Sequence, residues 1–384
     1  MKEDKTVPQL RFPEFTDAWK QRKLWEIAEK VTKKNSNLEI SETFTNSAEQ
    51  GIISQKDFFD HKVASTENIG NYYVVDNNDF VYNPRISTTA PVGPINRNRL
   101  DHAGVMSPLY TVFRAKDINQ LFLEWYFKSS CWHLFMYFNG DSGARSDRFS
   151  IKDSVFFSMP IFVPSKEEQF KIGRFFDQLN ETITLQQRKL NSHQKLKKGL
   201  FQKMFPKNGE NIPEIRFPEF SDAWKQRKVK ELCSISTGKS NTQDKIDDGE
   251  YPFYVRSPIV EHSNKYLFDE EAVLTVGDGV GTGKVFHYVN GKYDLHQRCY
   301  RMFAFKEDLR AKYFYYIFSK LFYKRVMAMT AKTSVDSVRL EMISEMSIPV
   351  PSVAEQLKIE SLLSELDNFI TLQQRWLFYT HKHS

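Results

Sequence analysis

The stretch PQLRFPEFTDAWKQRKL at residues 8–24 returns as PEIRFPEFSDAWKQRKV at residues 213–229. The two stretches are identical at 13 of 17 positions, at a constant offset of 205 residues. An internal repeat has to be recognised before any single motif, because a missed repeat misassigns the whole architecture. The chain therefore contains two units that open with the same segment.

A second matched pair lies at the far end of each unit. Residues 163–172 read VPSKEEQFKI and residues 350–359 read VPSVAEQLKI, at an offset of 187. The offset falls from 205 to 187, so the first unit holds 18 more residues between its matched segments than the second. The intervening sequences diverge, although weak similarities persist in the same order.

This contrast between matched ends and divergent middles has two interpretations. One is that the matched segments bind something common to both halves, while each middle binds something different. The other is an old duplication whose middles drifted without functional reason. Under either interpretation, both units are expected to share one fold.

The matched segments after Pro164 have helical periodicity. Ser165 is a suitable N-cap, and acidic residues follow in the first turn, where the helix dipole favours them. Residues at alternating steps of four and three are mostly apolar, which is typical of a coiled-coil seam. Both copies contain ITLQQR in the same register, with Gln186 and Gln373 as polar residues in the seam. The predicted interface consists of Ile172, Phe176, Leu179, Ile183, Gln186, Leu190, Ile359, Leu363, Leu366, Ile370, Gln373 and Leu377.

A helix with such a seam needs a partner, and the chain supplies one with the same pattern. A helix over 165–204 has a length of roughly 60 Å at 1.5 Å per residue, enough to hold two globular domains apart. The middles mix short β-like runs, turn residues and one aromatic-rich helix each, at 117–127 and 308–318. We therefore predict an α+β fold with two homologous globular domains joined by two long antiparallel coiled-coil helices. The expected segments are a first domain at 1–163, a central helix at 164–206, a second domain at 207–350 and a distal helix at 351–384.

Aromatic residues repeat at helical spacing in both predicted helices. Phe122, Trp125 and Tyr126 in the first copy correspond to Tyr313, Tyr316 and Ile317 in the second. Packing in the core is the favoured interpretation, and stacking on nucleic-acid bases is the alternative.

Basic residues lie among Gly, Ser, Thr and Pro in probable loops of both domains. Arginine can bind a guanine through two donors, and Asn can read adenine, so such loops suit DNA recognition. A plain surface charge is the alternative for each of them. The candidates are Arg85, Arg97, Arg99, Arg145 and Arg148 in the first domain, and Lys239, Arg256, Lys284, Arg298, Lys332 and Arg339 in the second.

Composition limits the class of protein. The apolar fraction of 40% and the 55 aromatic residues indicate a globular chain, and 54 basic against 48 acidic residues leave only +6, which permits a polyanionic partner without requiring one. Three widely spaced cysteines argue against a disulfide scaffold. The charged amino terminus and the absence of a long apolar segment predict a cytoplasmic protein without a membrane span.

Two glycine-rich segments resemble catalytic motifs only in part. STGKS at 236–240 ends like a phosphate loop, but the first glycine of that pattern falls at Cys233. GDGVGTG at 277–283 lies between two β-like runs, whereas a dinucleotide fingerprint opens a helix, so a hairpin loop is predicted. No metal-ligand pattern or serine elbow is found, and no catalytic residue is predicted.

Taken together, these segments resemble the DNA-specificity subunits of type I restriction-modification systems. The resemblance rests on RFPEFxDAWKxRK at 11–23 and 216–228, on PSxxEQxKI at 164–172 and 351–359, on ITLQQR in both copies, and on LKKGLFQKMFP at 196–206. It covers essentially the full chain. The doubled set of motifs is specific to this family.

The resemblance implies two target-recognition domains, each reading one half of a split sequence in double-stranded DNA. The helices would set the spacer and dock two modification subunits, which methylate adenine with S-adenosylmethionine after base flipping. Restriction subunits would then use ATP and Mg²⁺ to translocate and cut DNA. This chain would bind no cofactor itself and would supply recognition only.

Two alternatives stay open on the sequence: a tandem-repeat adaptor that does not touch DNA, and a stand-alone DNA methyltransferase. One departure from the repeat is also present. The chain stops at Ser384, before the counterpart of Met204, so the distal helix is expected to be shorter than the central one.

Overall fold

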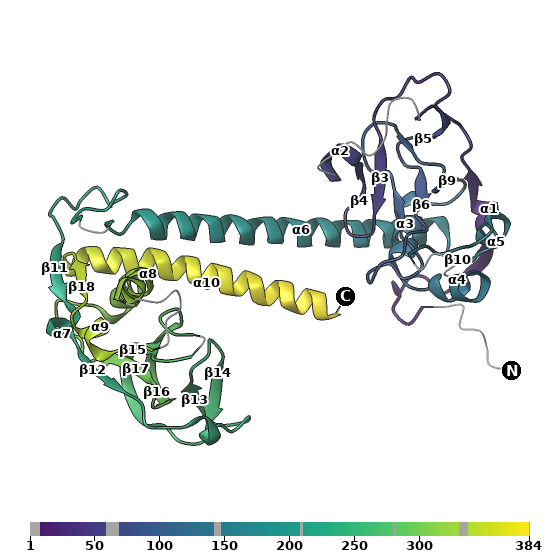
Figure 1. Ribbon diagram of the computed structural model, residues 1–384. Coiled ribbons are helices and arrows are strands. Elements are labelled where there is room, and N and C mark those ends of the chain that lie inside the picture. The colour runs from purple at the N-terminus through teal and green to yellow at the C-terminus, as the bar shows by residue number, and fades with distance from the viewer. Residues whose placement is uncertain are drawn as a thin grey trace. The chain divides into compact units, whose positions relative to one another are not determined.

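The computed structural model describes residues 8–58, 69–141, 147–207, 210–279, 281–329 and 337–383. The chain divides into two compact units, Met1–Thr184 and Leu185–Ser384 (Figure 1). The long helix α6 (Lys166–Lys203) begins in the first unit and ends in the second. This helix starts and ends within one residue of the range 165–204 that was predicted from the seam.

The first unit is built from short strands and short helices. Its sheets are β1 with β10, the four-stranded β2-β9-β6-β7, and the two-stranded pairs β3-β4 and β5-β8. The strands are β1 (Lys20–Lys23), β2 (Ala28–Lys30), β3 (Phe44–Ser47), β4 (Gly51–Ser54), β5 (Tyr73–Val75), β6 (Phe80–Tyr82), β7 (Ile95–Arg97), β8 (Gly104–Met106), β9 (Thr111–Ala115) and β10 (Pro160–Val163). Its helices before α6 are α1 (Leu24–Ile27), α2 (Gln55–Phe58), η1 (Ile69–Asn71), α3 (Gln120–Lys128), α4 (His133–Asn139) and α5 (Asp153–Phe156).

The second unit has longer strands. Its sheets are β11 with β18 and the six-stranded β12-β17-β15-β16-β13-β14. The strands are β11 (Lys225–Lys228), β12 (Ser234–Thr237), β13 (Tyr251–Tyr254), β14 (Val260–Ser263), β15 (Phe268–Val276), β16 (Phe286–Leu295), β17 (Cys299–Phe303) and β18 (Ser347–Val350). The helices are α7 (Val229–Leu232), η2 (Thr242–Asp244), α8 (Ala311–Met329), α9 (Leu340–Ser344) and α10 (Val353–His383).

The two units share one core topology, as the repeat predicts. In each, the opening segment forms a strand antiparallel to the strand before the long helix, with Lys20 opposite Val163 and Lys225 opposite Val350. The strand order β2-β9-β6-β7 corresponds to β12-β17-β15-β16. The units differ in the additions, because β13 and β14 extend the second sheet while β3-β4 and β5-β8 form separate pairs in the first. The α+β prediction is confirmed.

A buried ion pair ties the opening segment to the start of the long helix in the first unit. The Arg11 guanidinium donates to both carboxylate oxygens of Glu168 at 2.7 Å, and Glu168 is 1% exposed. The Trp19 indole N–H donates to the same carboxylate at 3.3 Å. Backbone groups also fix the helix start, because the Ser165 hydroxyl accepts from the Glu168 N–H at 3.2 Å. We call this arrangement the clasp.

The second unit repeats the clasp residue for residue. Arg216 donates to Glu355 at 2.7 and 2.8 Å, and the Trp224 indole N–H donates at 3.1 Å. The neighbouring Gln356 accepts from the Arg310 N–H at 2.9 Å and donates to the Asp308 carbonyl at 2.8 Å, which ties the helix start to the segment before α8. The matched residues of the repeat are therefore those that bind one another inside each unit.

The aromatic helices lie in the core, as favoured by the sequence. Phe122 of α3 is buried, and Tyr126 packs against the apolar core of the first unit. In α8, Tyr313, Tyr316 and Ile317 are all buried in the core of the second unit.

Eleven of the twelve predicted seam residues are buried or half-buried, and the exception is Phe176, which is 41% exposed. Within the second unit, α10 runs beside the end of α6 (Figure 1), with the His193 ring nitrogen 3.2 Å from the Gln373 amide oxygen and Lys197 paired with Asp367. Residue 193 of α6 meets residue 373 of α10, and residue 197 of α6 meets residue 367 of α10, so the two helices are antiparallel there. In the first unit, the Phe176 ring lies 5.6 Å from that of Trp125 on α3. The seam residues Leu190, Ile359, Leu363, Leu366 and Leu377 are buried, and Ile172, Leu179, Ile183, Gln186, Ile370 and Gln373 are half-buried.

The clasp predicts a large loss of stability on Arg216→Ala. This substitution leaves the Glu355 carboxylate buried without its charged partner, which costs about 3–5 kcal/mol. Denaturant unfolding of the full chain should show the loss, and hydrogen exchange should place it at β11 and β18. Arg339→Ala is the control, because Arg339 is exposed and lies 3.5 Å from Glu341, a pair worth at most about 1 kcal/mol. Equal losses for the two variants would contradict the role of the clasp.

The seam predicts that Leu366→Asp destabilises the second unit while Leu372→Asp does not. Leu366 is 7% exposed and Leu372, on the same helix, is 62% exposed. An unpaired charge at the buried position should cost about 3 kcal/mol or more, and the same charge at the exposed position less than about 0.5 kcal/mol. Thermal unfolding of both variants measures the difference. Comparable melting temperatures would show that α10 does not pack through this seam.

Candidate nucleic-acid interface

The eleven basic residues predicted to contact DNA are distributed over both units. Arg145 and Lys332 lie outside the described residues. The other nine fall into three groups according to what their side chains contact: those with internal partners, those brought together at the surface, and those at separate positions.

Arg97 and Arg99 have internal partners. Arg97, on β7, is 10% exposed and donates to Glu124 of α3 at 2.7 Å. Arg99 donates to Glu124 at 2.8 Å and to Asp177 of α6 at 2.6 Å. Burial, the largest influence, lowers the pKa of Arg99, but its hydrogen bonds to Glu124 and Asp177 outweigh it and raise the pKa overall. These arginines therefore connect the sheet, α3 and the long helix.

A buried polar network that the sequence did not single out lies next to this pair. The Asn96 amide donates to the Asn46 side-chain oxygen at 2.7 Å, and Asn83 donates to the Asn46 carbonyl at 2.8 Å. Lys128 of α3 donates to Asn96, and burial lowers the pKa of this ammonium group. The network joins the β3-β4 hairpin to β6 and β7. Its only signal in the sequence is the presence of Asn in β-like segments, where it is normally depleted.

Arg85 and Arg148 are brought together in the first unit. They form an isolated antiparallel bridge, and the Phe149 N–H donates to the Pro84 carbonyl at 2.7 Å. Arg85 is exposed and Arg148 is half-buried. Among the described residues, neither forms an ion pair, so both guanidinium groups are available for a ligand.

Arg256 and Arg298 are brought together in the second unit by a shared carboxylate. Arg256 lies 3.4 Å from one oxygen of Asp278, and Arg298 lies 3.8 Å from the other. His296 adjoins them. The pKa of the His296 ring is lowered overall. Burial lowers this pKa most, Arg256 and Arg298 lower it further, and Asp278 opposes them by raising it. Asp278 and His296 were not singled out by sequence reasoning, although Asp278 lies inside the GDGVGTG segment.

The remaining candidates lie at separate positions. Lys239 is exposed, two residues after the end of β12. The Lys284 ammonium lies 5.0 Å above the centre of the Tyr323 ring. Arg339 is exposed and lies beside Glu341. The preceding residue, Val338, donates its N–H to the Gly277 carbonyl at 2.7 Å.

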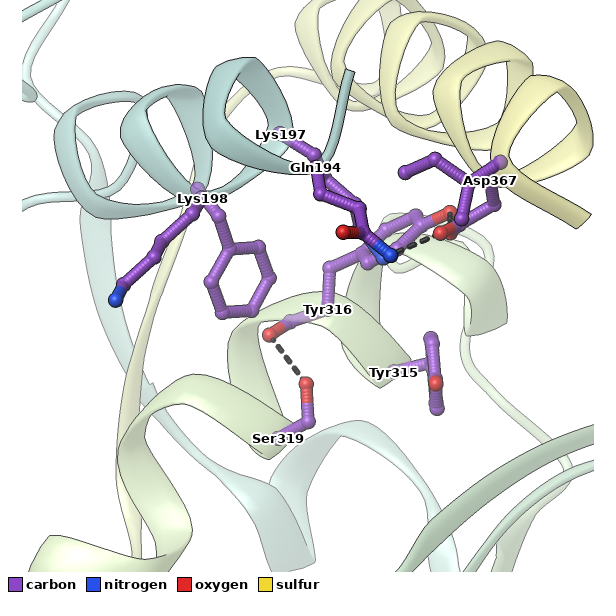
Figure 2. Close-up of a pocket in the computed structure, with 9 residues that line it drawn as sticks. Gln194, Lys197, Lys198, Tyr315, Tyr316, Ser319 and Asp367 are labelled. Atoms are coloured by element: carbon purple, nitrogen blue, oxygen red, sulfur yellow. Dashed lines mark hydrogen bonds and ion pairs between the residues drawn. The ribbon is translucent and has the colours of Figure 1, made fainter. Parts of the chain in front are cut away.

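A groove of about 320 Å³ opens between α6, α8 and α10 within the second unit. Figure 2 shows Gln194, Lys197 and Lys198 from α6 facing Tyr315, Tyr316 and Ser319 from α8. Asp367 of α10 accepts from the Tyr316 hydroxyl at 2.9 Å and pairs with Lys197. Two of the charged groups of this groove, Lys197 and Asp367, therefore neutralise each other.

The described part of the chain has no set of three or more His, Cys, Asp or Glu side chains arranged to hold a metal ion. No helix within the described ranges is both long and apolar enough to cross a bilayer. The three cysteines are free thiols, and burial raises the pKa of Cys233 and of Cys299 to about 12.

Comparison with known proteins gives one family. The family model described as "Type I restriction modification DNA specificity domain" matches residues 16–193 and 221–377, one match in each half of the chain. A curated relative, the type I restriction enzyme EcoDI specificity subunit of Escherichia coli, is 28% identical over 149 residues, which are 38% of this chain and 32% of the relative. Another, the MjaVIII specificity subunit of Methanocaldococcus jannaschii, is 27% identical over 255 residues, 59% of each chain. The chain thus spans between about a third and three fifths of the length of these relatives.

A solved structure shares the fold. The crystal structure of the type I restriction-modification system S subunit from M. genitalium matches with a TM-score of 0.63 at 14% identity, covering 97% of this chain and 95% of that one.

Proposed function

This chain belongs to the family of type I restriction modification DNA specificity domains, and on that premise we propose that it is the subunit that selects the DNA target of a type I restriction-modification complex. Each unit reads one half of a bipartite sequence. The unread spacer between the half-sites is set by the long helices. The subunit works in the cytoplasm, where the DNA is.

The observation that carries the proposal is the pairing of one core with two different sets of loops. Both units have the same clasp and the same four-strand order, but their additional strands differ. A core that is the same in both units is consistent with a partner that binds each half in the same way. Different loops fit two different half-sites, since base readout depends on the side chains that loops present.

The basic residues differ in whether their charge is held by an internal carboxylate or is exposed to a ligand. Arg97 and Arg99 are held by Glu124, so we assign them to the support of the loops. Arg85 and Arg148 in the first unit, and Lys239, Arg256 and Arg298 in the second, expose at least part of their charge, so we assign these to DNA. Lys284 and Arg339 remain candidates, as do Arg145 and Lys332.

The chemistry belongs to partner subunits in this proposal. Two modification subunits dock on the long helices and methylate adenine with S-adenosylmethionine. Restriction subunits use ATP and Mg²⁺ to act on unmodified DNA. This chain acts as a non-catalytic recognition subunit.

Mapping of methylated adenines tests the proposal directly. The chain is co-expressed with the modification subunits of its system in a host that lacks other adenine methyltransferases. We expect genome-wide methylation at one bipartite motif with a fixed spacer. Modification subunits expressed alone are the control and should give no such motif. Methylation that is scattered, contiguous or independent of this chain would overturn the proposal.

Salt dependence of binding separates DNA recognition from an adaptor role. Binding of the assembled complex to duplex DNA should weaken linearly in log–log form as salt rises, with a slope of about −0.9 for each phosphate neutralised. If the chain were a protein adaptor that does not touch DNA, the slope for the complex would be the same with and without this chain.

The purified chain alone should not methylate DNA in the presence of S-adenosylmethionine, whereas a stand-alone methyltransferase would.

A further inference from the structure

The two glycine-rich segments that match no catalytic motif meet at one place in the second unit. The Gly238 N–H donates to the Cys299 carbonyl at 3.1 Å, and the Lys239 N–H donates to the Leu295 carbonyl at 3.1 Å. From the other segment, the Gly277 N–H donates to the Arg298 carbonyl at 2.8 Å. STGKS and the start of GDGVGTG therefore flank the turn His296–Arg298 that connects β16 to β17.

Close approach of the backbone explains both glycines. A Cβ at residue 238 would lie 2.1 Å from the Leu295 carbonyl oxygen, and one at residue 277 would lie 2.4 Å from the Arg298 carbonyl oxygen. Both neighbours are backbone atoms, which cannot move aside as a flexible side chain can. The glycines thus allow two loops to pack against the turn.

Backbone hydrogen bonds hold the turn itself. The His296 N–H donates to the Tyr254 carbonyl at 2.9 Å, and the Gln297 N–H donates to the Ser240 carbonyl at 2.8 Å. The buried His296 ring accepts from the Arg298 N–H through Nδ1 at 3.0 Å. A turn fixed in this way presents its side chains in a defined direction, which lowers the entropy cost of binding.

The side chains presented at this place are polar, basic and accessible. Gln297 and Lys239 are exposed, although the Gln297 amide donates to the Asn241 side-chain oxygen, and the side chains of Arg298 and Arg256 are 66% and 48% exposed. Both arginines meet Asp278 at distances longer than a close hydrogen bond, so the ion pairs are weak and exchange easily for another partner. Arg301 on β17 shows the contrast, because it is largely buried and held by Ser236 and Glu270.

We propose that the turn His296–Arg298 is the base-reading element of the second unit. It enters the major groove, where Gln297 and Arg298 meet base edges. Lys239 and Arg256 contact flanking phosphates, and Asp278 positions the two arginines before DNA binds. Gln suits adenine and Arg suits guanine, so the half-site read by this unit contains an A·T pair opposite Gln297 and a G·C pair opposite Arg298. This inference rests on the proposed function and extends it to named residues.

Arg298→Ala and Gln297→Ala test the assignment in the full chain with its modification subunits. Each variant should lose discrimination at one base pair of one half-site, with about a 5- to 150-fold loss of affinity for the cognate duplex. The other half-site should be read as in the unaltered chain. Lys306→Ala is the matched control, since Lys306 is exposed beyond the opposite end of β17 and its loss removes the same charge.

Methylation motifs of the variants distinguish the possible results. Degeneracy confined to one half-site supports the inference. Two unaltered half-sites in both variants overturn it but leave the proposed function standing. Absence of any bipartite motif with the unaltered chain overturns the proposed function itself. Uniform loss of binding to all sequences, with the motif unchanged, would show that the turn contacts only phosphates and would also overturn base reading.

Asp278→Asn tests the positioning role. The amide keeps the shape of the carboxylate but loses its charge, so binding to unrelated DNA should stay equal or tighten, while the ratio of cognate to unrelated affinity falls by about tenfold or more. An unchanged melting temperature checks that the fold is retained. An unchanged affinity ratio would show that Asp278 does not position the arginines.

Discussion

The buried ion pair between the opening segment and the long helix is the constraint on which each unit depends. Glu168 and Glu355 are almost fully buried, and a buried carboxylate is tolerated only with charged and hydrogen-bonded partners. Arginine and tryptophan from a segment between 131 and 157 residues earlier in the chain supply those partners. These contacts close each unit on itself, bring its first strand against its last, and fix where the long helix begins. The repeat is therefore nearly identical in sequence where these contacts form.

Carboxylates determine which basic residues remain available in the loops. Glu124 engages Arg97 and Arg99 in the first unit, and Glu270 engages Arg301 in the second, so these cations support the fold. Asp278 instead meets two exposed arginines at longer distances. A sequence shows the arginines equally in all these cases. Only the distance and burial of the nearest acid separate a supporting arginine from one that is proposed to bind DNA.

The glycine-rich segments show how local and tertiary information differ. GDGVGTG lies between β15 and β16, so its prediction as a hairpin loop is confirmed. Its neighbour in space, STGKS, lies about 40 residues earlier and begins in the last two residues of β12, which pairs with β17 and not with β15. No spacing rule relates the two segments. Their meeting at the turn His296–Arg298 follows from strand order alone.

The sequence by itself determined the duplication, the shared α+β fold, most of the seam positions on the long helices and the core role of the aromatic stripes. These features depend on periodicity and on repeated local patterns, which the order of residues expresses directly. Tertiary structure alone decided which cations have internal partners, that a buried asparagine network joins the first unit's hairpin to its sheet, and that Asp278 lies between Arg256 and Arg298. The physical reason is that burial and ion pairing depend on contacts between segments far apart in the chain, whose positions are set only when the strands are ordered into sheets.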